Sequence, residues 1–147
     1  MKLNGHKKDT VEQNNTEIIL SDQELRKLQL DLLEMLIEVD RICRKYQIAY
    51  SLDGGSLLGA VRHGGFIPWD DDVDVIMRRK EYQRFYKACK RELDQKRFTL
   101  QEYRTDKNYR WGYAKLRRKG TEFVRLGQEH ICLLYTSPSP RDRSVSR

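Results

Sequence analysis

Residues 54–75 read GGSLLGAVRHGGFIPWDDDVDV, and this stretch organises the fold around a potential site. A glycine turn at its start leads into a short helical segment, and aspartates at its end lead into an alternating strand pattern. Backbone N–H groups of such a turn can hold phosphate oxygens, and paired carboxylates can hold the divalent cation that a phosphate ester needs. The pattern therefore indicates phosphoryl or nucleotidyl transfer.

Asp72 and Asp74 stand two positions apart in the expected strand, where alternate residues share a face. The flanking valines indicate a buried strand, in which unpaired carboxylates would be costly without a cation. We expect Asp72 and Asp74 to bind Mg²⁺ or Mn²⁺, and we expect Asp70 and Asp71 to shape or solvate the turn. An acidic turn that faces water without a metal is the alternative that this motif alone leaves open.

Gly54, Gly55 and Ser56 lie between an expected strand at residues 48–52 and an expected helix that ends near Arg62. Their N–H groups and the positive end of the helix can hold an anion, with Ser56 as the expected N-cap. An ordinary helix start is the alternative for this turn. The sequence excludes a Walker A loop and contains no Gly-x-Gly-x-x-Gly pattern.

Four other side chains near these motifs carry expectations of their own. We expect Arg62 and His63 to neutralise phosphate charge, although His63 also fits a surface position. Lys115 is a second candidate for offsetting charge on the substrate. Trp69 is expected in the core rather than as a platform that stacks on a base.

The flanking segments predict an α+β domain with a mixed sheet and flanking helices. Ser21 and Glu24 form a capping-box pattern at the start of a helix that runs to about Tyr46. One apolar stripe follows this helix, at Leu25, Leu28, Leu32, Met35, Val39, Ile42 and Tyr46. Further elements are expected as a helix at residues 80–95, with Phe85, Cys89 and Leu93 buried, and strands at 98–103, 111–116 and 121–126. Residues 1–20 are expected to be a loose arm.

Composition limits the cellular setting of the chain. It has 147 residues and a net charge of +7, and it shows neither an apolar run long enough to span a membrane nor a secretory signal. Three widely spaced cysteines indicate free thiols in a reducing compartment. We expect a cytoplasmic protein, with contact to the inner face of the membrane as an option. Because Arg117, Arg118 and Lys119 form a basic run, a nucleic-acid-binding module remains an alternative, as does a solvated strand edge.

The last residues differ from the rest of the chain. Residues 132–142 resemble the in-frame translation of two joined sequencing-library adapter elements. A natural disordered tail is the alternative that the composition permits. We expect residues 132–147 to be a non-native tail, and residues 21–131 to be the N-terminal part of a domain that is incomplete at its C-terminus.

Residues 54–75 closely resemble the signature of the LicD family of phosphocholine transferases, which are related to the fukutin-type ribitol-phosphate transferases. A looser resemblance runs from Leu28 to Phe123. It implies a nucleotidyltransferase-type fold, in which Asp72 and Asp74 are metal ligands and Gly55 and Ser56 hold phosphates. It also implies transfer of a phospho-alcohol, often phosphocholine, from a CDP-linked donor to a sugar hydroxyl of a cell-surface glycan such as lipopolysaccharide or teichoic acid.

The resemblance also predicts what this chain lacks. The family pattern continues into an apolar strand with a third acidic residue, and here the adapter-like sequence stands in its place. We therefore expect an inactive fragment with an unpaired sheet edge. A nucleotidyltransferase that moves a nucleoside monophosphate to a small molecule is the nearest alternative, and no nucleic-acid partner is expected.

Overall fold

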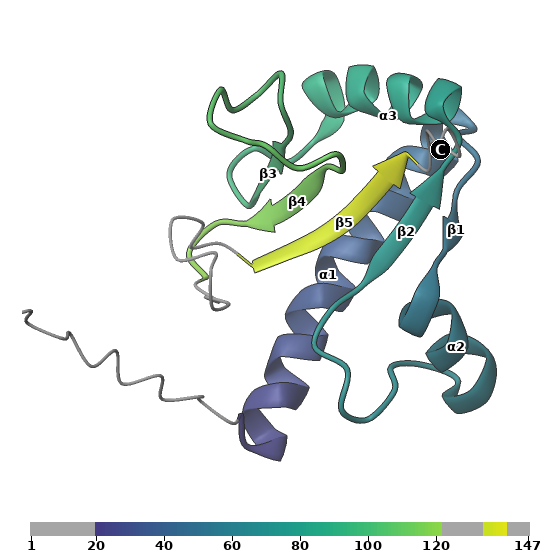
Figure 1. Ribbon diagram of the computed structural model, residues 1–147, viewed down its shortest axis with the longest axis vertical. Coiled ribbons are helices and arrows are strands. Elements are labelled where there is room, and N and C mark those ends of the chain that lie inside the picture. The colour runs from purple at the N-terminus through teal and green to yellow at the C-terminus, as the bar shows by residue number, and fades with distance from the viewer. Residues whose placement is uncertain (1–19, 122–133, 141–147) are drawn as a thin grey trace, which may run out of the picture.

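The structure is a computed structural model that describes residues 20–121 and the strand at 134–140 (Figure 1). Its helices and strands, in chain order, are α1 (Asp22–Tyr46), β1 (Ser51–Leu52), α2 (Gly54–His63), β2 (Asp74–Met77), α3 (Arg79–Glu92), β3 (Phe98–Gln101), β4 (Lys115–Arg118) and β5 (Leu134–Pro140). The strands form one mixed sheet in the order β1-β2-β5-β4-β3. Only β2 and β5 pair in parallel, and the other neighbours are antiparallel. The expected α+β class is confirmed.

Helix α1 follows the sequence prediction closely. The Ser21 hydroxyl accepts from the Glu24 N–H, and the Glu24 carboxylate accepts from the Ser21 N–H, which completes the capping box. Gln47 ends the helix in the left-handed conformation, with a φ of 52°. The central members of the apolar stripe are buried, and its two ends are partly buried. The amphipathic pattern therefore predicted both the helix and the face that it packs.

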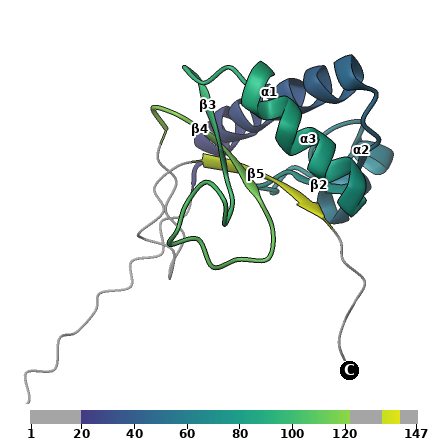
Figure 2. The ribbon, with the colours of Figure 1, turned by 90° about the horizontal axis from the view of Figure 1, so that it is seen from above.

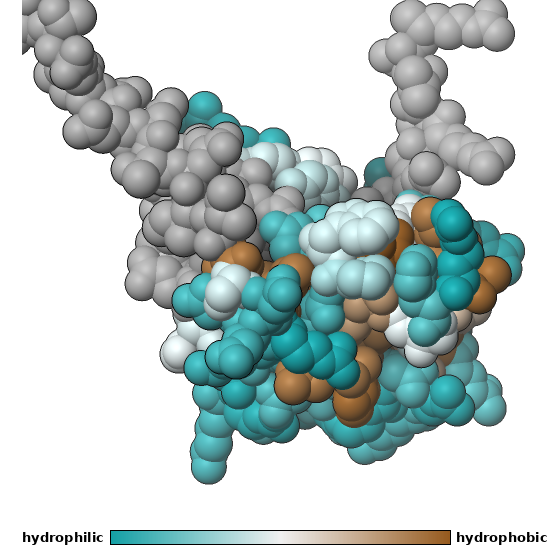
Figure 3. Space-filling model, turned by 90° about the horizontal axis from the view of Figure 1, so that it is seen from below, coloured by the Kyte–Doolittle hydropathy of each residue, from teal (hydrophilic) through white to brown (hydrophobic). Residues whose placement is uncertain are grey.

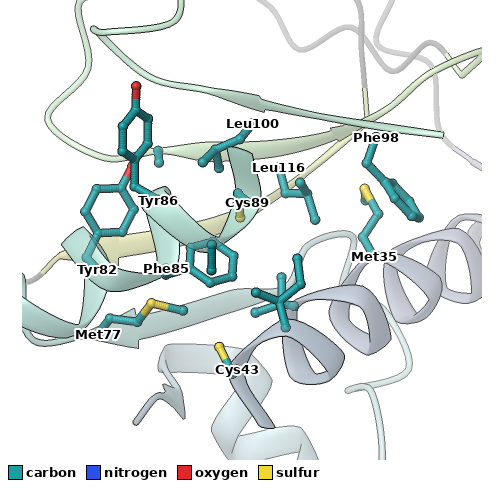
Figure 4. Packing of buried hydrophobic residues seen from close by; sticks show 14 of the residues in the cluster. Met35, Cys43, Met77, Tyr82, Phe85, Tyr86, Cys89, Phe98, Leu100 and Leu116 are labelled. Carbon is teal, nitrogen blue, oxygen red and sulfur yellow. The ribbon is translucent and has the colours of Figure 1, made fainter. Parts of the chain in front are cut away.

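The core lies between the sheet and the helices α1 and α3, which contact each other and β5. Figure 4 shows Cys43 of α1, Phe85 of α3 and Leu116 of β4 directed into this core. Viewed from above, the helices lie on one side of the sheet, and the β3–β4 connection projects on the other (Figure 2). One face of the sheet is thus filled by packing, whereas Asp74 of β2 and Lys115 and Arg117 of β4 lie on the opposite face by alternation with the buried residues.

Strand β2 begins at Asp74, later than expected, so Asp72 lies in the loop before it. The burial pattern nevertheless alternates as predicted: Val73, Val75 and Met77 are buried, and the residues between them are half-buried. Strand β1 is shorter than the expected strand at 48–52 because only Ser51 and Leu52 pair with β2.

Helix α3 confirms the expected helix near residues 80–95, with Phe85 and Cys89 buried and Leu93 partly buried. Strand β3 confirms the strand expected at 98–103, although it ends at Gln101. The strand expected at 111–116 lies later in the chain, because residues 111–114 form no regular structure and β4 starts at Lys115. Apart from Thr121, the strand expected at 121–126 lies outside the described residues.

The expectation of an unpaired sheet edge is wrong, because β5 occupies the centre of the sheet. Its backbone pairs with β2 on one side and β4 on the other. Backbone pairing tolerates many sequences, so the adapter-like segment can supply a strand. Its sequence carries no acidic residue, and Pro138 and Pro140 have no N–H to donate to the sheet. The non-native origin of residues 132–147 stays a prediction.

The face seen from below is mostly hydrophilic, with apolar patches that appear in brown (Figure 3). The most exposed large apolar side chains of the helices belong to α1 and α2: Leu30, Leu33, Ile37, Leu57, Leu58 and Val61. Within residues 20–121 and 134–140, no helix combines the length and apolar composition needed to cross a membrane. Contact with a membrane surface stays a prediction.

Candidate functional site

The acidic turn is closed by a β-turn immediately before it. The Asp70 N–H donates to the Ile67 carbonyl at 2.9 Å, with Pro68 and Trp69 at the central positions of the turn. Proline suits the first of these positions because its φ is already fixed. Trp69 follows it and projects outward, 77% exposed, so the expectation that Trp69 belongs to the core is wrong. Phe66 packs against the core instead.

Asp70, Asp71 and Asp72 form a cluster directly after this turn. One carboxylate oxygen from each lies within 4.8 Å of the others, and all three side chains are half-buried. Burial raises the pKa of Asp70, and the charges of Asp72 and Asp71 raise it further. Crowded carboxylate oxygens of this kind suit a hard divalent cation, which would relieve their repulsion. The residues present therefore fit Mg²⁺ or Mn²⁺.

The composition of this cluster differs from the sequence expectation. Asp70 and Asp71 join Asp72, although we expected them only to shape the turn. Asp74 begins β2 and is not part of this group of three among the described residues. Asp72 and Asp74 as a pair of metal ligands stay a prediction, with Asp70 and Asp71 as further carboxylates close to Asp72.

The glycine turn and the acidic segment are connected by hydrogen bonds and by close packing. The Ser56 hydroxyl accepts from the Asp74 N–H at 2.9 Å, and the Asp53 N–H donates to the Asp74 carbonyl at 3.0 Å. A Cβ on Gly55 would lie 2.8 Å from Oδ2 of Asp70. The two halves of the sequence motif therefore meet in space, as their spacing predicted.

Helix α2 starts three residues before the expected position. Asp53 is its N-cap residue, so the prediction of Ser56 as the cap is wrong. Gly54 has a φ of +52°, which a residue with a side chain rarely adopts. Ser56 instead lies in the first turn of α2, where its hydroxyl binds the backbone of β2. Gly64 ends the helix as predicted, with a φ of +64°.

The basic residues expected near the phosphate turn are more dispersed. Arg62 and His63 are exposed at the far end of α2, about 13 Å along the helix from Gly54. Lys115 is fully buried, and its ammonium lies 5.1 Å from the ring centre of Trp111 and 5.6 Å from that of Tyr113. The binding roles of Arg62, His63 and Lys115 stay predictions.

Strand registers place Lys115 near Asp74 in spite of this burial. Asp74 pairs with position 137 of β5, and Leu116 pairs with position 136. Lys115 therefore falls in the same row as Asp74, with β5 between them, at a backbone separation of about 10 Å. By alternation, both lie on the face opposite the core residue Leu116. This is the arrangement that charge compensation across the sheet would need.

The basic run that suggested a nucleic-acid module is engaged within the protein. The Arg117 side chain is buried and donates to Gln101, and Arg118 Nε donates to Glu34 Oε2 at 2.7 Å. Lys119 Nζ donates to the Gln95 carbonyl at 2.6 Å. These contacts argue against an open basic surface.

Gln29 of α1 is a site residue that the sequence did not reveal. It is 4% exposed, and its side-chain Nε2 lies 3.3, 3.4 and 3.0 Å from the carbonyl oxygens of Ile67, Pro68 and Asp70. One buried amide thus ties the turn that carries the aspartates to the longest helix. The one sequence signal for this role is that Gln29 is a polar residue beside the apolar stripe of the helix.

A family model described as "LicD/FKTN/FKRP, nucleotidyltransferase domain" matches residues 47–134, which is more than half of the chain. The match includes both the glycine turn and the acidic cluster. It also spans β1 to β4, so the site described above lies inside the matched region.

Two curated relatives match part of the chain. The chain is 59% identical over 61 residues to the lipopolysaccharide cholinephosphotransferase LicD of Haemophilus influenzae, covering 42% of this chain and 23% of that protein. It is 68% identical over 28 residues to the ribitol 5-phosphate transferase FKRP of Homo sapiens, covering 19% of this chain and 6% of that protein. The chain therefore matches less than a quarter of the length of each of these relatives.

Proposed function

Because the chain belongs to the LicD/FKTN/FKRP nucleotidyltransferase-domain family, we propose that it serves transfer of a phospho-alcohol, such as phosphocholine, from a CDP-linked donor to a sugar hydroxyl. The single observation that carries the proposal is the contact between the glycine turn and the acidic cluster, where Gly55 lies against the Asp70 carboxylate. A diphosphate held by the start of α2 would then lie beside carboxylates suited to a cation. The two named relatives, LicD and FKRP, are transferases of this chemical type.

The residues of the chain would divide the work as follows. The backbone N–H groups at the start of α2 and its positive end would hold donor phosphate oxygens. Asp72, with Asp70, Asp71 or Asp74, would hold Mg²⁺ or Mn²⁺, which supplies charge neutralisation of the diphosphate when bound. Ser56 and Gln29 would keep the glycine turn and the acidic turn in register. Such a site accelerates transfer mainly by positioning and by electrostatic stabilisation.

Binding is the first test, because the strand β5 lacks the third acidic residue that the family pattern predicts. Isothermal titration calorimetry should show CDP-choline binding to the chain that requires Mg²⁺ or Mn²⁺. Asp72→Ala should weaken it at least about tenfold, or about 1.4 kcal/mol. Leu30→Ala, on the exposed side of α1, is the matched control and should bind as the wild type does.

Two results would contradict the proposal. Donor binding that is equally tight with a chelator present would remove the cation from the site. Release of pyrophosphate from CTP, rather than CMP from CDP-choline, would assign nucleotidyl transfer to a small molecule instead.

A further inference from the structure

A cavity lies near the end of β2 that is away from the aspartates. Its volume is about 300 Å³, and it lies between the start of α3 and the β3–β4 connection. The beginning of this connection contacts α3, because the Tyr82 hydroxyl donates to Glu102. We call it the aromatic cavity, after residues that line it: Arg79, Tyr82, Gln83, Tyr103, Trp111 and Tyr113.

The base of the aromatic cavity is rigid and electrostatically balanced. Glu102 is 2% exposed and accepts from Arg104 Nε at 2.6 Å, from Arg104 Nη2 at 2.7 Å and from the Tyr82 hydroxyl at 2.9 Å. The Arg104 guanidinium also lies 3.7 Å from the ring centre of Tyr86. The bidentate pair of Glu102 and Arg104, stacked on Tyr86, holds the base of the cavity in place, and the opposite charges of the pair largely cancel.

The other walls offer aromatic surface. Tyr103 is 66% exposed, and Trp111 and Tyr113 are partly exposed. The Lys115 ammonium lies within cation–π distance of both Trp111 and Tyr113. These rings therefore already interact with one cation, which weakens their attraction for a second.

The positive charges and the aromatic surface of the cavity together favour a sugar over a quaternary ammonium group. A quaternary ammonium group would be opposed by Arg79, Arg104 and Lys115, against the single carboxylate of Glu102. A sugar ring, by contrast, presents C–H groups that pack on aromatic faces and hydroxyls that bond to arginine, glutamine and tyrosine side chains. The chemistry of the cavity fits a neutral or anionic sugar.

The distance between the aromatic cavity and the aspartates decides whether the sugar bound in the cavity can be the one that receives the phospho-alcohol. Strand β2, from Asp74 to Met77, is about 10 Å long, with Asp72 before it and Arg79 beyond it, so the aspartates and the aromatic cavity lie about 10 Å or more apart along the strand. A single sugar ring cannot occupy the cavity and also present its hydroxyl at the aspartates. We propose that the aromatic cavity binds a sugar of an oligosaccharide acceptor that is remote from the hydroxyl receiving the phospho-alcohol. This inference rests on the proposed function.

Calorimetry can test this with two probes: the core oligosaccharide of deacylated Haemophilus influenzae lipopolysaccharide, and free glucose. The oligosaccharide should bind the chain at least about tenfold more tightly than glucose does. Tyr103→Ala and Trp111→Ala should each weaken oligosaccharide binding by about tenfold, the effect of one lost aromatic contact. Tyr103→Phe keeps the ring and should bind nearly as the wild type does. Leu30→Ala is the control for an exposed apolar residue elsewhere.

The outcomes separate this inference from the proposed function. Unchanged oligosaccharide affinity in a folded Tyr103→Ala variant would overturn the inference that the aromatic cavity binds a sugar. The same conclusion would follow if the wild type did not bind the oligosaccharide, or bound it no more tightly than glucose. Because Tyr103 is exposed, that variant stays informative if Trp111→Ala unfolds. If the wild type bound the oligosaccharide but showed no Mg²⁺-dependent binding of CDP-choline, the transferase proposal would be overturned and the sugar site would remain.

Discussion

The two ends of β2 hold their carboxylates in opposite ways. Before the strand, Asp70, Asp71 and Asp72 crowd together with oxygens within 4.8 Å of one another. Beyond it, Glu102 is surrounded by donors from Arg104 and Tyr82. The pKa values respond accordingly. Burial and like charge raise that of Asp70, whereas for Glu102 burial acts to raise the pKa but the donors outweigh it and lower the pKa.

This difference separates a site that needs a ligand from a wall that does not. Clustered like charges store repulsion that a bound cation would release. A buried, fully hydrogen-bonded carboxylate gains nothing from a cation and instead fixes the surrounding side chains. The first arrangement suits charge chemistry, and the second suits recognition by shape and aromatic surface.

Loss of the paired carboxylate should have the largest effect on stability. Glu102→Ala would leave Arg104 and the buried Tyr82 hydroxyl without their acceptor, and because hydrogen bonds to a charged group contribute about 1.5–3 kcal/mol, we expect a loss of about 3 kcal/mol. The free energy of unfolding from urea titration measures this. Asp71→Ala removes a carboxylate of the same turn as Asp70 and should cost far less. Equal losses in the two variants would contradict the comparison.

A cation should stabilise the protein through one end of β2 only. At a concentration of 100 times its dissociation constant, Mn²⁺ should add about 2.7 kcal/mol to the free energy of unfolding. Thermal melts with and without Mn²⁺ measure this. The gain should vanish in Asp72→Ala and persist in Glu102→Gln. A gain retained in Asp72→Ala would place the cation elsewhere.

Gln29 tests whether the acidic turn depends on its anchor. Gln29→Leu keeps a similar volume but removes the donor to the carbonyls of Ile67, Pro68 and Asp70. Hydrogen bonds of this kind contribute about 1 kcal/mol each, so we expect a loss of about 1–2 kcal/mol in urea titration. Mn²⁺ stabilisation should also fall, because the carboxylates would be less well ordered. A variant with a weaker fold but unchanged Mn²⁺ stabilisation would show that the anchor is only structural.

Local patterns in the sequence predicted much of the fold. The capping box and apolar stripe gave α1, and the alternation around Val73 and Val75 gave the buried side of β2. These signals are local because each depends on the repeat of one helix or strand. The meeting of the glycine turn with the acidic segment was also predictable, because the residues between them form one short helix and a return loop.

The remaining features depend on contacts between distant segments. Gln29 looks like an ordinary helix residue until the turn at Pro68 is placed against it. Lys115 looks exposed until Trp111 and Tyr113 fold over it. Trp69 looks like a core residue, because hydrophobicity does not show that a β-turn will direct it outward. Strand β5 escaped prediction because backbone pairing imposes few demands on side chains.

The smallest expected effect is a difference in pH dependence between the two ends of β2, measured in a chelating buffer. A carboxylate whose folded pKa is raised, as for Asp70, destabilises the folded state at neutral pH. That penalty is relieved as the pH falls through the folded pKa and is absent below the unfolded value of about 3.9. Asp70→Asn should thus be slightly more stable than the wild type at pH 7, by about 0.5 kcal/mol or less, and should lose this advantage on acidification.

Glu102 should behave in the opposite sense, because its folded pKa is lowered. Its contribution is fully present above the unfolded value of about 4.3 and is lost only as the pH falls through the lower folded value. The deficit of Glu102→Gln should therefore be constant from pH 7 to about pH 5 and shrink below pH 4. Urea midpoints of the wild type and both variants at pH 7, 5 and 3.5 measure the two curves. If both variants followed the same pH dependence, the contrast between crowded and paired carboxylates would not hold, and Asp70 would lie in an environment that its neighbours do not perturb.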